Sequence, residues 1–98
     1  MSVLLEFAMF PTDKGVSVSD YVARIIRNLE NKSCTYQLTP MGTIIETENI
    51  EQALEIVKES YYLLENDCNR VYSSLKFDIR KNQENRMQAK MNSIKSKL

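Results

Sequence analysis

Residues 71–79, VYSSLKFDI, alternate between two sets of side chains. The first set is Val71, Ser73, Leu75, Phe77 and Ile79, and the second is Tyr72, Ser74, Lys76 and Asp78. Because side chains along a β-strand point alternately to its two faces, this pattern predicts a strand with one covered face and one open face. One strand is not stable alone, so the rest of the chain has to supply partner strands and a covering layer.

Three other segments have strand patterns. Residues 3–10 form an apolar run broken only by Glu6, and residues 35–39 and 43–47 are two arms joined by the turn Pro40-Met41-Gly42. Near-continuous apolar runs are typical of strands covered on both sides. We therefore expect residues 3–10 in the middle of the sheet. We expect residues 71–79 to lie beside them, also in the middle, as the position that we take to be usual for the first and last strands of a fold with this order.

Two helical patterns separate these strands, and a third follows them. Ser17 and Asp20 have the spacing of a capping box, and Asn49 with Gln52 provides a similar start for the second helix. The apolar stripes are Val18, Tyr21, Val22, Ile25 and Leu29 in the first helix, and Ile50, Ala53, Leu54, Val57, Tyr61 and Leu64 in the second. A weaker stripe among basic residues, Met87, Met91, Ile94 and Leu98, predicts a C-terminal helix.

The order is β-α-β-β-α-β with an additional C-terminal helix, which predicts an α+β fold, the ferredoxin-like sandwich. With 98 residues, the chain is expected to form a single domain over residues 1–98. Right-handed crossovers place the first two helices on one face of an antiparallel sheet. The other face should then carry Glu6, Ala8, Tyr72, Ser74, Lys76 and Asp78, and also Glu46 if Ile45 points toward the helices.

Composition argues against several kinds of function. Lysine plus arginine (13) equals aspartate plus glutamate (13), and there is no histidine, so neither a strong general field for nucleic acid nor the usual zinc or Cys-His chemistry is expected. Cys34 and Cys68 are expected to be reduced and buried.

No segment reads as a signal peptide or a membrane span, which predicts a cytoplasmic protein. No nucleophile–base pair and no arginine in the first loop are present, so we expect no enzyme, no catalytic residues, no metal and no cofactor.

The open sheet face admits three interpretations. Its charged groups can be ordinary cross-strand partners, with Lys76 pairing with Glu46 or Glu6. The face can also pack on a second copy of the chain, because open sheets favour two-fold dimers. Finally, it can form a small-molecule pocket that a neighbouring subunit closes. RNA binding is disfavoured, since Phe7 and Phe77 are expected to face the helices and only Lys76 flanks the aromatic residues.

Four segments carry a family resemblance: SVSDYV (17–22), YQLTPMGTIIE (36–46), VKESY (57–61) and RVYSSLKFDIR (70–80). In this order and spacing the chain resembles the thiamine-binding-protein family, the YkoF-like group. Two positions depart from the family pattern. Tyr61 stands where the family often has a histidine, and the turn before the last strand reads Asn66-Asp67-Cys68 where the family often has a glycine. The resemblance implies a ferredoxin-like fold, assembly through sheet faces and edges into homodimers or homotetramers, and non-catalytic binding of thiamine or its hydroxymethylpyrimidine moiety.

The resemblance also places a set of residues on the family pattern, and we infer that they bind the ligand: Ser17, Tyr36, Met41, Thr43, Glu46, Lys76 and Asp78. Glu46 or Asp78 would accept a hydrogen bond from the aminopyrimidine or balance the thiazolium charge, and Tyr36 or Tyr72 would stack on a ring. Ser17 and Thr43 would supply hydroxyls, Met41 an adaptable apolar contact, and Lys76 a supporting salt bridge. The alternative is a structural or interaction module that oligomerises without a small-molecule ligand.

Overall fold

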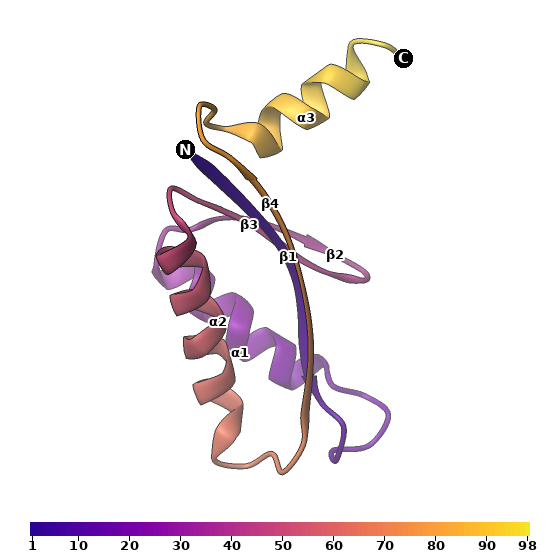
Figure 1. Cartoon of the computed structure of the whole chain (residues 1–98). Helices are drawn as coiled ribbons and strands as arrows, with labels where there is room; N and C mark the ends of the chain where they lie inside the picture. Colours follow the sequence, from indigo (N-terminus) through magenta and orange to yellow (C-terminus); the bar gives the residue numbers. More distant parts are fainter.

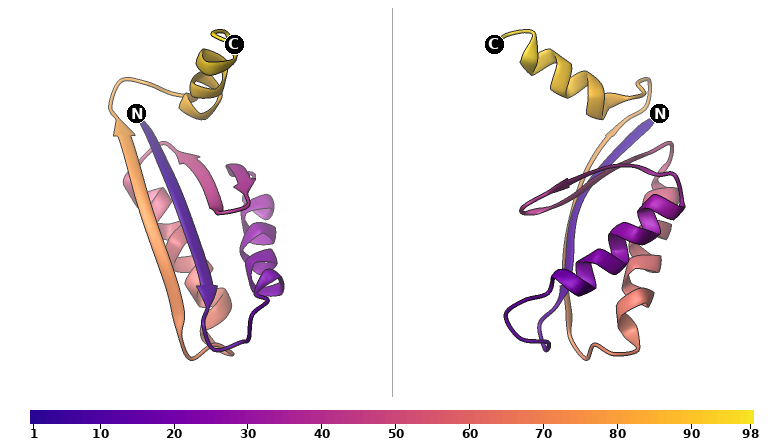
Figure 2. Two further views of the ribbon diagram at one scale, coloured as in Figure 1. Left: turned by 90° about the vertical axis from the view of Figure 1, so that its right-hand side faces the viewer. Right: turned by 180° about the vertical axis from the view of Figure 1, so that it is seen from behind.

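The computed structural model describes residues 1–98 and contains the predicted elements in the predicted order. They are β1 (Ser2–Pro11), α1 (Ser19–Asn31), β2 (Thr35–Thr39), β3 (Gly42–Thr47), α2 (Ile50–Glu65), β4 (Val71–Arg80) and α3 (Arg86–Lys95). Helices α1 and α2 lie on one side of the sheet, whereas α3 lies on the other side near the start of β1 (Figures 1 and 2). The α+β, ferredoxin-like fold is confirmed. None of the helices is long and apolar enough to cross a membrane.

The four strands form one antiparallel sheet in the order β2-β3-β1-β4. Strands β1 and β3 are therefore central, and the prediction that residues 71–79 lie in the middle was wrong for β4, which is an edge strand. Only the first of its ten residues is even partly buried. Its apolar character misled the prediction because an apolar side chain on an edge strand can remain exposed when no neighbouring element covers it.

The core lies between the sheet and helices α1 and α2. On β1 every second side chain from Val3 to Met9 is buried, and these pack with Ile45 of β3 and with residues of both helices. The helical members of this cluster are Ile25, Leu29, Ala53, Ile56 and Leu64. The cysteines are both free; Cys68 is buried, and Cys34 is only half-buried. The alternation along β1 therefore defines a covered face, which we call the helix face, and the open face opposite it.

The two predicted helix starts had different outcomes. Asn49 caps α2 as predicted, since its side-chain oxygen accepts a hydrogen bond from the backbone N–H of Gln52 at 2.8 Å. The capping box at Ser17 was wrong, because α1 begins two residues later, after Val18, and has no side-chain cap. Ser17 is exposed in the loop before α1.

The buried stripe of α2 is rotated from the predicted one. Ile56 and Ser60 are buried along with Ala53 and Leu64, whereas Leu54 and Tyr61 are 47% and 40% exposed. Ser60 is accommodated because its hydroxyl donates a hydrogen bond to the carbonyl oxygen of Ile56 at 2.7 Å. The stripe predicted from the sequence contained the large apolar residues Leu54 and Tyr61, and both of them remain at the surface.

Candidate functional site

A groove of about 330 Å³ lies between the open face of the sheet and α3. Its apolar lining comes from Leu4, Ile44 and Phe77 on the sheet and from Met87 and Met91 on α3. The polar groups of the lining are Glu6, Gln37, Lys76, Asp78 and Lys90. An apolar lining with a few polar groups, at the small end of ligand-pocket volumes, is typical of small-molecule sites.

The charges along the groove are arranged in pairs. Nζ of Lys76 lies 3.4 Å from Oε1 of Glu6, which confirms one of the two predicted pairings, and both side chains are well exposed. Asp78 accepts a hydrogen bond from Nζ of Lys90 at 2.8 Å and also pairs with the guanidinium of Arg86. The hydrogen bond from Lys90 and, to a smaller extent, that from Arg86 hold the pKa of Asp78 below its usual range. Asp78 is therefore ionised at neutral pH.

Glu46 binds the N-terminus of α3 to the sheet. Its Oε2 accepts hydrogen bonds from Oγ of Ser2 at 2.6 Å and from the backbone N–H of Arg86 at 2.7 Å. Its Oε1 accepts from the backbone N–H of Met87 at 3.3 Å. Burial alone would raise the pKa of Glu46, but these three donors and the nearby guanidinium hold it below its usual range. A carboxylate here satisfies two free N–H groups of the helix and lies at the positive end of its dipole.

Arg86 makes the second connection between α3 and the sheet. Its side chain is 2% exposed. Nη1 donates hydrogen bonds to the carbonyl oxygens of Ser2 at 3.2 Å and of Asp78 at 3.0 Å, so that one side chain joins β1, β4 and α3. With Glu46, Arg86 fixes the helix that forms one wall of the groove.

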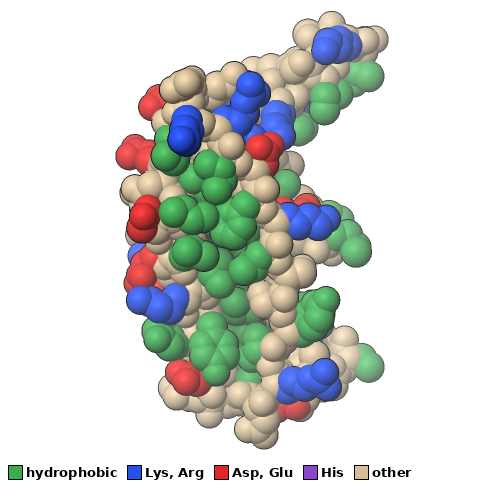
Figure 3. Space-filling model, in the orientation of Figure 1, with side chains coloured by type: hydrophobic (Ala, Val, Ile, Leu, Met, Phe, Trp, Pro, Cys, Tyr) green, Lys and Arg blue, Asp and Glu red, His purple; other side chains and the backbone are tan.

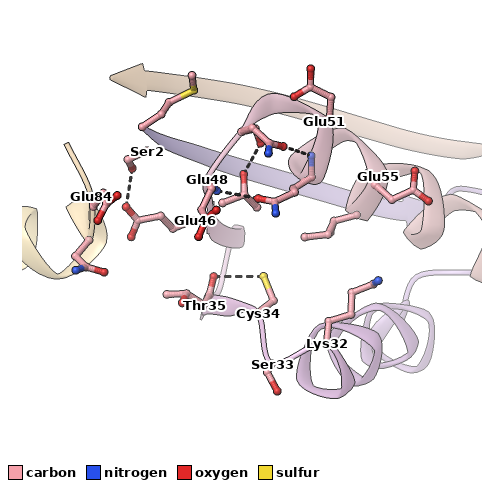
Figure 4. A pocket seen from close by; sticks show the side chains of 16 residues that line it. Ser2, Lys32, Ser33, Cys34, Thr35, Glu46, Glu48, Glu51, Glu55 and Glu84 are labelled. Carbon is pink, nitrogen blue, oxygen red and sulfur yellow. Dashed lines mark hydrogen bonds between the residues drawn. The ribbon is translucent and has the colours of Figure 1, made fainter. Parts of the chain in front are cut away.

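A larger recess, about 830 Å³, lies on the other side of Glu46, between the start of α2 and the end of β3 (Figure 4). Five glutamates line it, namely Glu46, Glu48, Glu51, Glu55 and Glu84. The one basic side chain of the lining, Lys32, lies 2.9 Å from Oε1 of Glu59 and is thereby neutralised. Only three of its sixteen lining residues are hydrophobic. The recess is therefore a region of negative potential with little apolar surface for a flat ring, and the smaller groove is the better candidate.

Comparison with known proteins identifies the family. The family model described as thiamine-binding protein matches residues 5–95, nearly the whole chain. The chain belongs to the thiamine-binding protein family. Among curated members of similar sequence, the UPF0045 protein MJ1052 of Methanocaldococcus jannaschii is 36% identical over 92 residues, 94% of this chain and 91% of that protein. A UPF0045 protein of Methanothermobacter thermautotrophicus is 32% identical over 85 residues, 86% of each chain.

Solved structures agree with this assignment. The crystal structure of MJ1052 from M. jannaschii superposes with a TM-score of 0.84 at 35% identity over 95% of both chains. A putative thiamine biosynthesis/salvage protein, TM0486 from Thermotoga maritima, superposes with a TM-score of 0.77 over 94% of this chain and 99% of that one. At 18% identity, the second likeness shows the fold alone.

The resemblance to the thiamine-binding protein family selected seven residues, and three of them lie on the open face. Glu46 follows Ile45, which is fully buried in the helix face, and so points to the opposite side of the sheet. Lys76 and Asp78 pair in register with Glu6 and Leu4, which line the groove from the same face. The ligand-binding roles of these three residues stay predictions.

The other four of the seven lie elsewhere. Thr43 is 5% exposed and lies on the helix face with Ile45. Tyr36 pairs in register with Ile45, and its hydroxyl donates a hydrogen bond to Oε1 of Glu30 in α1 at 2.9 Å. Met41, 86% exposed, is in the hairpin turn, and Ser17 is in the loop before α1. The structure therefore does not bring these four residues into the groove.

The resemblance to the thiamine-binding protein family also missed residues that the structure brings together. Leu4 and Ile44 could have been found from the alternation along their strands, because Leu4 shares a face with Glu6 and Ile44 shares a face with Glu46. Met87 and Met91 belong to the predicted C-terminal stripe, but nothing in their spacing shows that this stripe covers the open face. Arg86 has no sequence signal that separates it from the other basic residues of the C-terminal segment.

Glu46→Gln is expected to loosen α3 by about 1 kcal/mol, because the neutral side chain loses its interaction with the helix dipole and accepts weaker hydrogen bonds. In the native protein the stabilisation of α3 by the Glu46 carboxylate is fully present above the ordinary carboxyl pKa of about 4.3. This stabilisation is lost as the pH falls through the pKa of Glu46 in the folded state, which is lower than the ordinary value. Hydrogen exchange of the α3 amides between pH 3 and 7 measures it. Glu48→Gln, an exposed neighbour, is the control. Equal protection of α3 in both variants would contradict the capping role.

Proposed function

We propose that this protein binds thiamine or its hydroxymethylpyrimidine moiety, without catalysing a reaction, in the groove between the open face and α3. The observation that carries the proposal is the composition of this groove, in which apolar side chains lie on two opposing walls beside paired carboxylates. Residues of the sheet form one wall and residues of α3 form the other. A flat ring would lose its contact with water on both faces between these walls.

The polar groups suit the same ligand. The amino group of a pyrimidine can donate to the carboxylate of Glu6 or Asp78, and the amide of Gln37 offers both a donor and an acceptor to the ring nitrogens. The positive thiazolium of thiamine is compatible with the nearby lysines, because Lys76 is paired with Glu6 and Lys90 with Asp78. Methionines on the helical wall can adapt to the outline of the ring.

The family supports the ligand class, and the exposed surface of the open face supports closure by a second copy. Tyr72 on this face is 54% exposed, and its ring lies 5.6 Å from the ring of Phe10. Aromatic residues are enriched at protein–protein interfaces relative to the rest of the surface. A neighbouring subunit in a homodimer or homotetramer would cover the groove and exclude water from its charges.

Thermal unfolding with added ligand tests the proposal. Thiamine or hydroxymethylpyrimidine at 100 times its dissociation constant should add about 2.7 kcal/mol to the free energy of unfolding. Glu6→Gln should weaken binding at least tenfold, because a charged acceptor becomes neutral in the groove. Glu65→Gln, at the exposed end of α2, is the matched control and should leave the ligand shift unchanged.

A protein whose melting temperature does not change with millimolar thiamine or hydroxymethylpyrimidine would contradict the binding proposal. That result would favour the second candidate, an oligomerisation or interaction module without a ligand. The specific observation behind this candidate is the long exposed edge strand β4, which offers a binding surface whether or not the groove is occupied.

A further inference from the structure

A second hollow adjoins the groove and shares part of its lining. It has a volume of about 510 Å³ and lies between α3 and the hairpin of β2 and β3. Gln37, Met87 and Met91 line both spaces, so the two adjoin along α3. Figure 3 shows the molecule hollowed at this place, beneath the projecting α3. We call this second space the polar compartment.

The polar compartment differs from the groove in its side chains. Apart from the two shared methionines, its lining consists of Thr35, Tyr36, Gln37, Glu46, Asn85 and Gln88. Most of these side chains carry amides or hydroxyls, which both donate and accept hydrogen bonds. No lysine or arginine lines this space. The compartment therefore suits a neutral polar group, such as the hydroxyl of an alcohol.

Glu46 is the one charged residue of this lining, and it occupies the position that an anion would take. Helix N-termini bind phosphate groups through their free N–H groups and the positive end of the helix dipole. At the start of α3, the N–H groups of Arg86 and Met87 already donate to the Glu46 carboxylate, at 2.7 and 3.3 Å. A phosphate in the polar compartment would therefore meet a carboxylate instead of these two donors.

The cations of the neighbouring groove do not offset this charge. Nζ of Lys76 lies 3.4 Å from Oε1 of Glu6, and Lys90 and Arg86 both pair with Asp78. Together with Glu46, three carboxylates thus match the three cations around the two spaces. A phosphate monoester carries about 1.5 to 2 negative charges at neutral pH, and no cation here is left to balance them.

We propose that the polar compartment receives the hydroxyl-bearing end of the ligand and rejects its phosphate ester, so that the site selects the unphosphorylated form. This inference rests on the proposed function. Thiamine and hydroxymethylpyrimidine each carry one hydroxyl group, and a phosphate ester forms at that oxygen. Glu46 determines the selectivity, because its carboxylate closes the end of α3 to a second anion and repels it.

The same charge suits the second ring of thiamine. The thiazolium is positive, so a space with one carboxylate and no basic side chain accommodates it better than the groove, which two lysines line. The pyrimidine then lies in the groove beside Gln37, and the thiazolium with its hydroxyethyl arm lies in the polar compartment. In hydroxymethylpyrimidine the hydroxymethyl group replaces the link to the thiazolium, so its hydroxyl points into the same compartment.

Calorimetric titration with two pairs of compounds tests the inference. The pairs are thiamine with thiamine monophosphate, and hydroxymethylpyrimidine with its phosphate ester. We expect at least one parent compound to bind, and its ester to bind about tenfold more weakly or worse at about 50 mM salt. At about 500 mM salt this difference should narrow, because salt screens the repulsion of charges and does not relieve steric exclusion.

Gln88→Arg reverses the charge balance of the polar compartment and keeps Glu46 in place. We expect this variant to bring the affinity for the ester to within about threefold of the affinity for the parent compound, since the guanidinium can pair with the phosphate. Ser93→Arg is the matched control. It adds the same charge to α3 at an exposed position that lines neither space, and it should leave the difference unchanged.

The outcomes separate the inference from the proposed function. Equal or tighter binding of the ester would overturn the inference while thiamine or hydroxymethylpyrimidine still bound. The inference would also fall if high salt left the difference unchanged, or if Gln88→Arg changed it no more than Ser93→Arg does. If none of the four compounds bound, the proposed function would be contradicted, and the inference with it.

Discussion

Replacing Leu5 with alanine should lower the free energy of unfolding by about 2–5 kcal/mol, because the substitution removes buried methyl groups and leaves a cavity in a close-packed core. Leu5 has no exposed surface and lies at the centre of the sheet, with Ile45 of β3 on one side and Phe77 of β4 on the other. Since domains of this size have a total stability of about 5–15 kcal/mol, a loss at the upper end would leave a partly unfolded population at room temperature. Urea unfolding followed by circular dichroism measures the change.

Leu38→Ala is the matched control for this prediction. Leu38 is the same residue type on edge strand β2, but it is 56% exposed. Its truncation should change stability by less than about 0.5 kcal/mol. Equal losses for the two variants would show that the helix face of β1 is not the centre of the core.

Arg86→Met should detach α3 from the sheet and cost about 2–3 kcal/mol of its docking free energy. The guanidinium is almost fully buried, and its hydrogen bonds to the carbonyl oxygens of Ser2 and Asp78 cannot be made by methionine. Hydrogen bonds from a charged donor are stronger than those between neutral groups, so the loss of both weakens the attachment of α3 to the sheet. We expect the α3 amides to lose protection from hydrogen exchange while the amides of β1 keep theirs.

Arg86→Lys distinguishes the shape of the side chain from its charge. A lysine keeps the positive charge but lacks the planar fork that contacts β1 and β4 together, so we expect an intermediate loss of protection. Lys95→Met, which removes an exposed charge from the last turn of α3, should have little effect. If α3 exchanged equally slowly in Arg86→Met and in the native protein, Arg86 would not be what fastens the helix.

Local patterns in the sequence predicted the elements well and their neighbours less well. The alternation of residues 71–79 correctly divided the side chains of β4 between two faces. It could not reveal that β4 is an edge strand, because alternation depends on the strand's own geometry and not on which strands flank it. The same limit applied to α2, where Leu54 and Tyr61 fit a helical stripe as well as Ile56 and Ser60 do, yet only the latter two are buried.

The candidate site shows the same division. Alternation predicted that Glu46, Lys76 and Asp78 share the open face, and it did so from a local rule that holds in any sheet. The resemblance to the family added Tyr36 and Thr43, which the structure places on the opposite face. The main roles of Glu46 and Arg86 were not predicted, since both depend on contacts between residues at least 40 positions apart along the chain.

The sequence by itself determined the order of the strands and helices, which side chains share a face, and the balance of charge, because these depend on residue type and on periods of two or 3.6 residues. The tertiary structure alone decided which strand lies at the edge, that the C-terminal helix lies against the open face, and that a buried arginine and a capping glutamate hold it there. These features arise when distant segments compete to cover the same surface, and the spacing of residues within one segment carries no record of that competition.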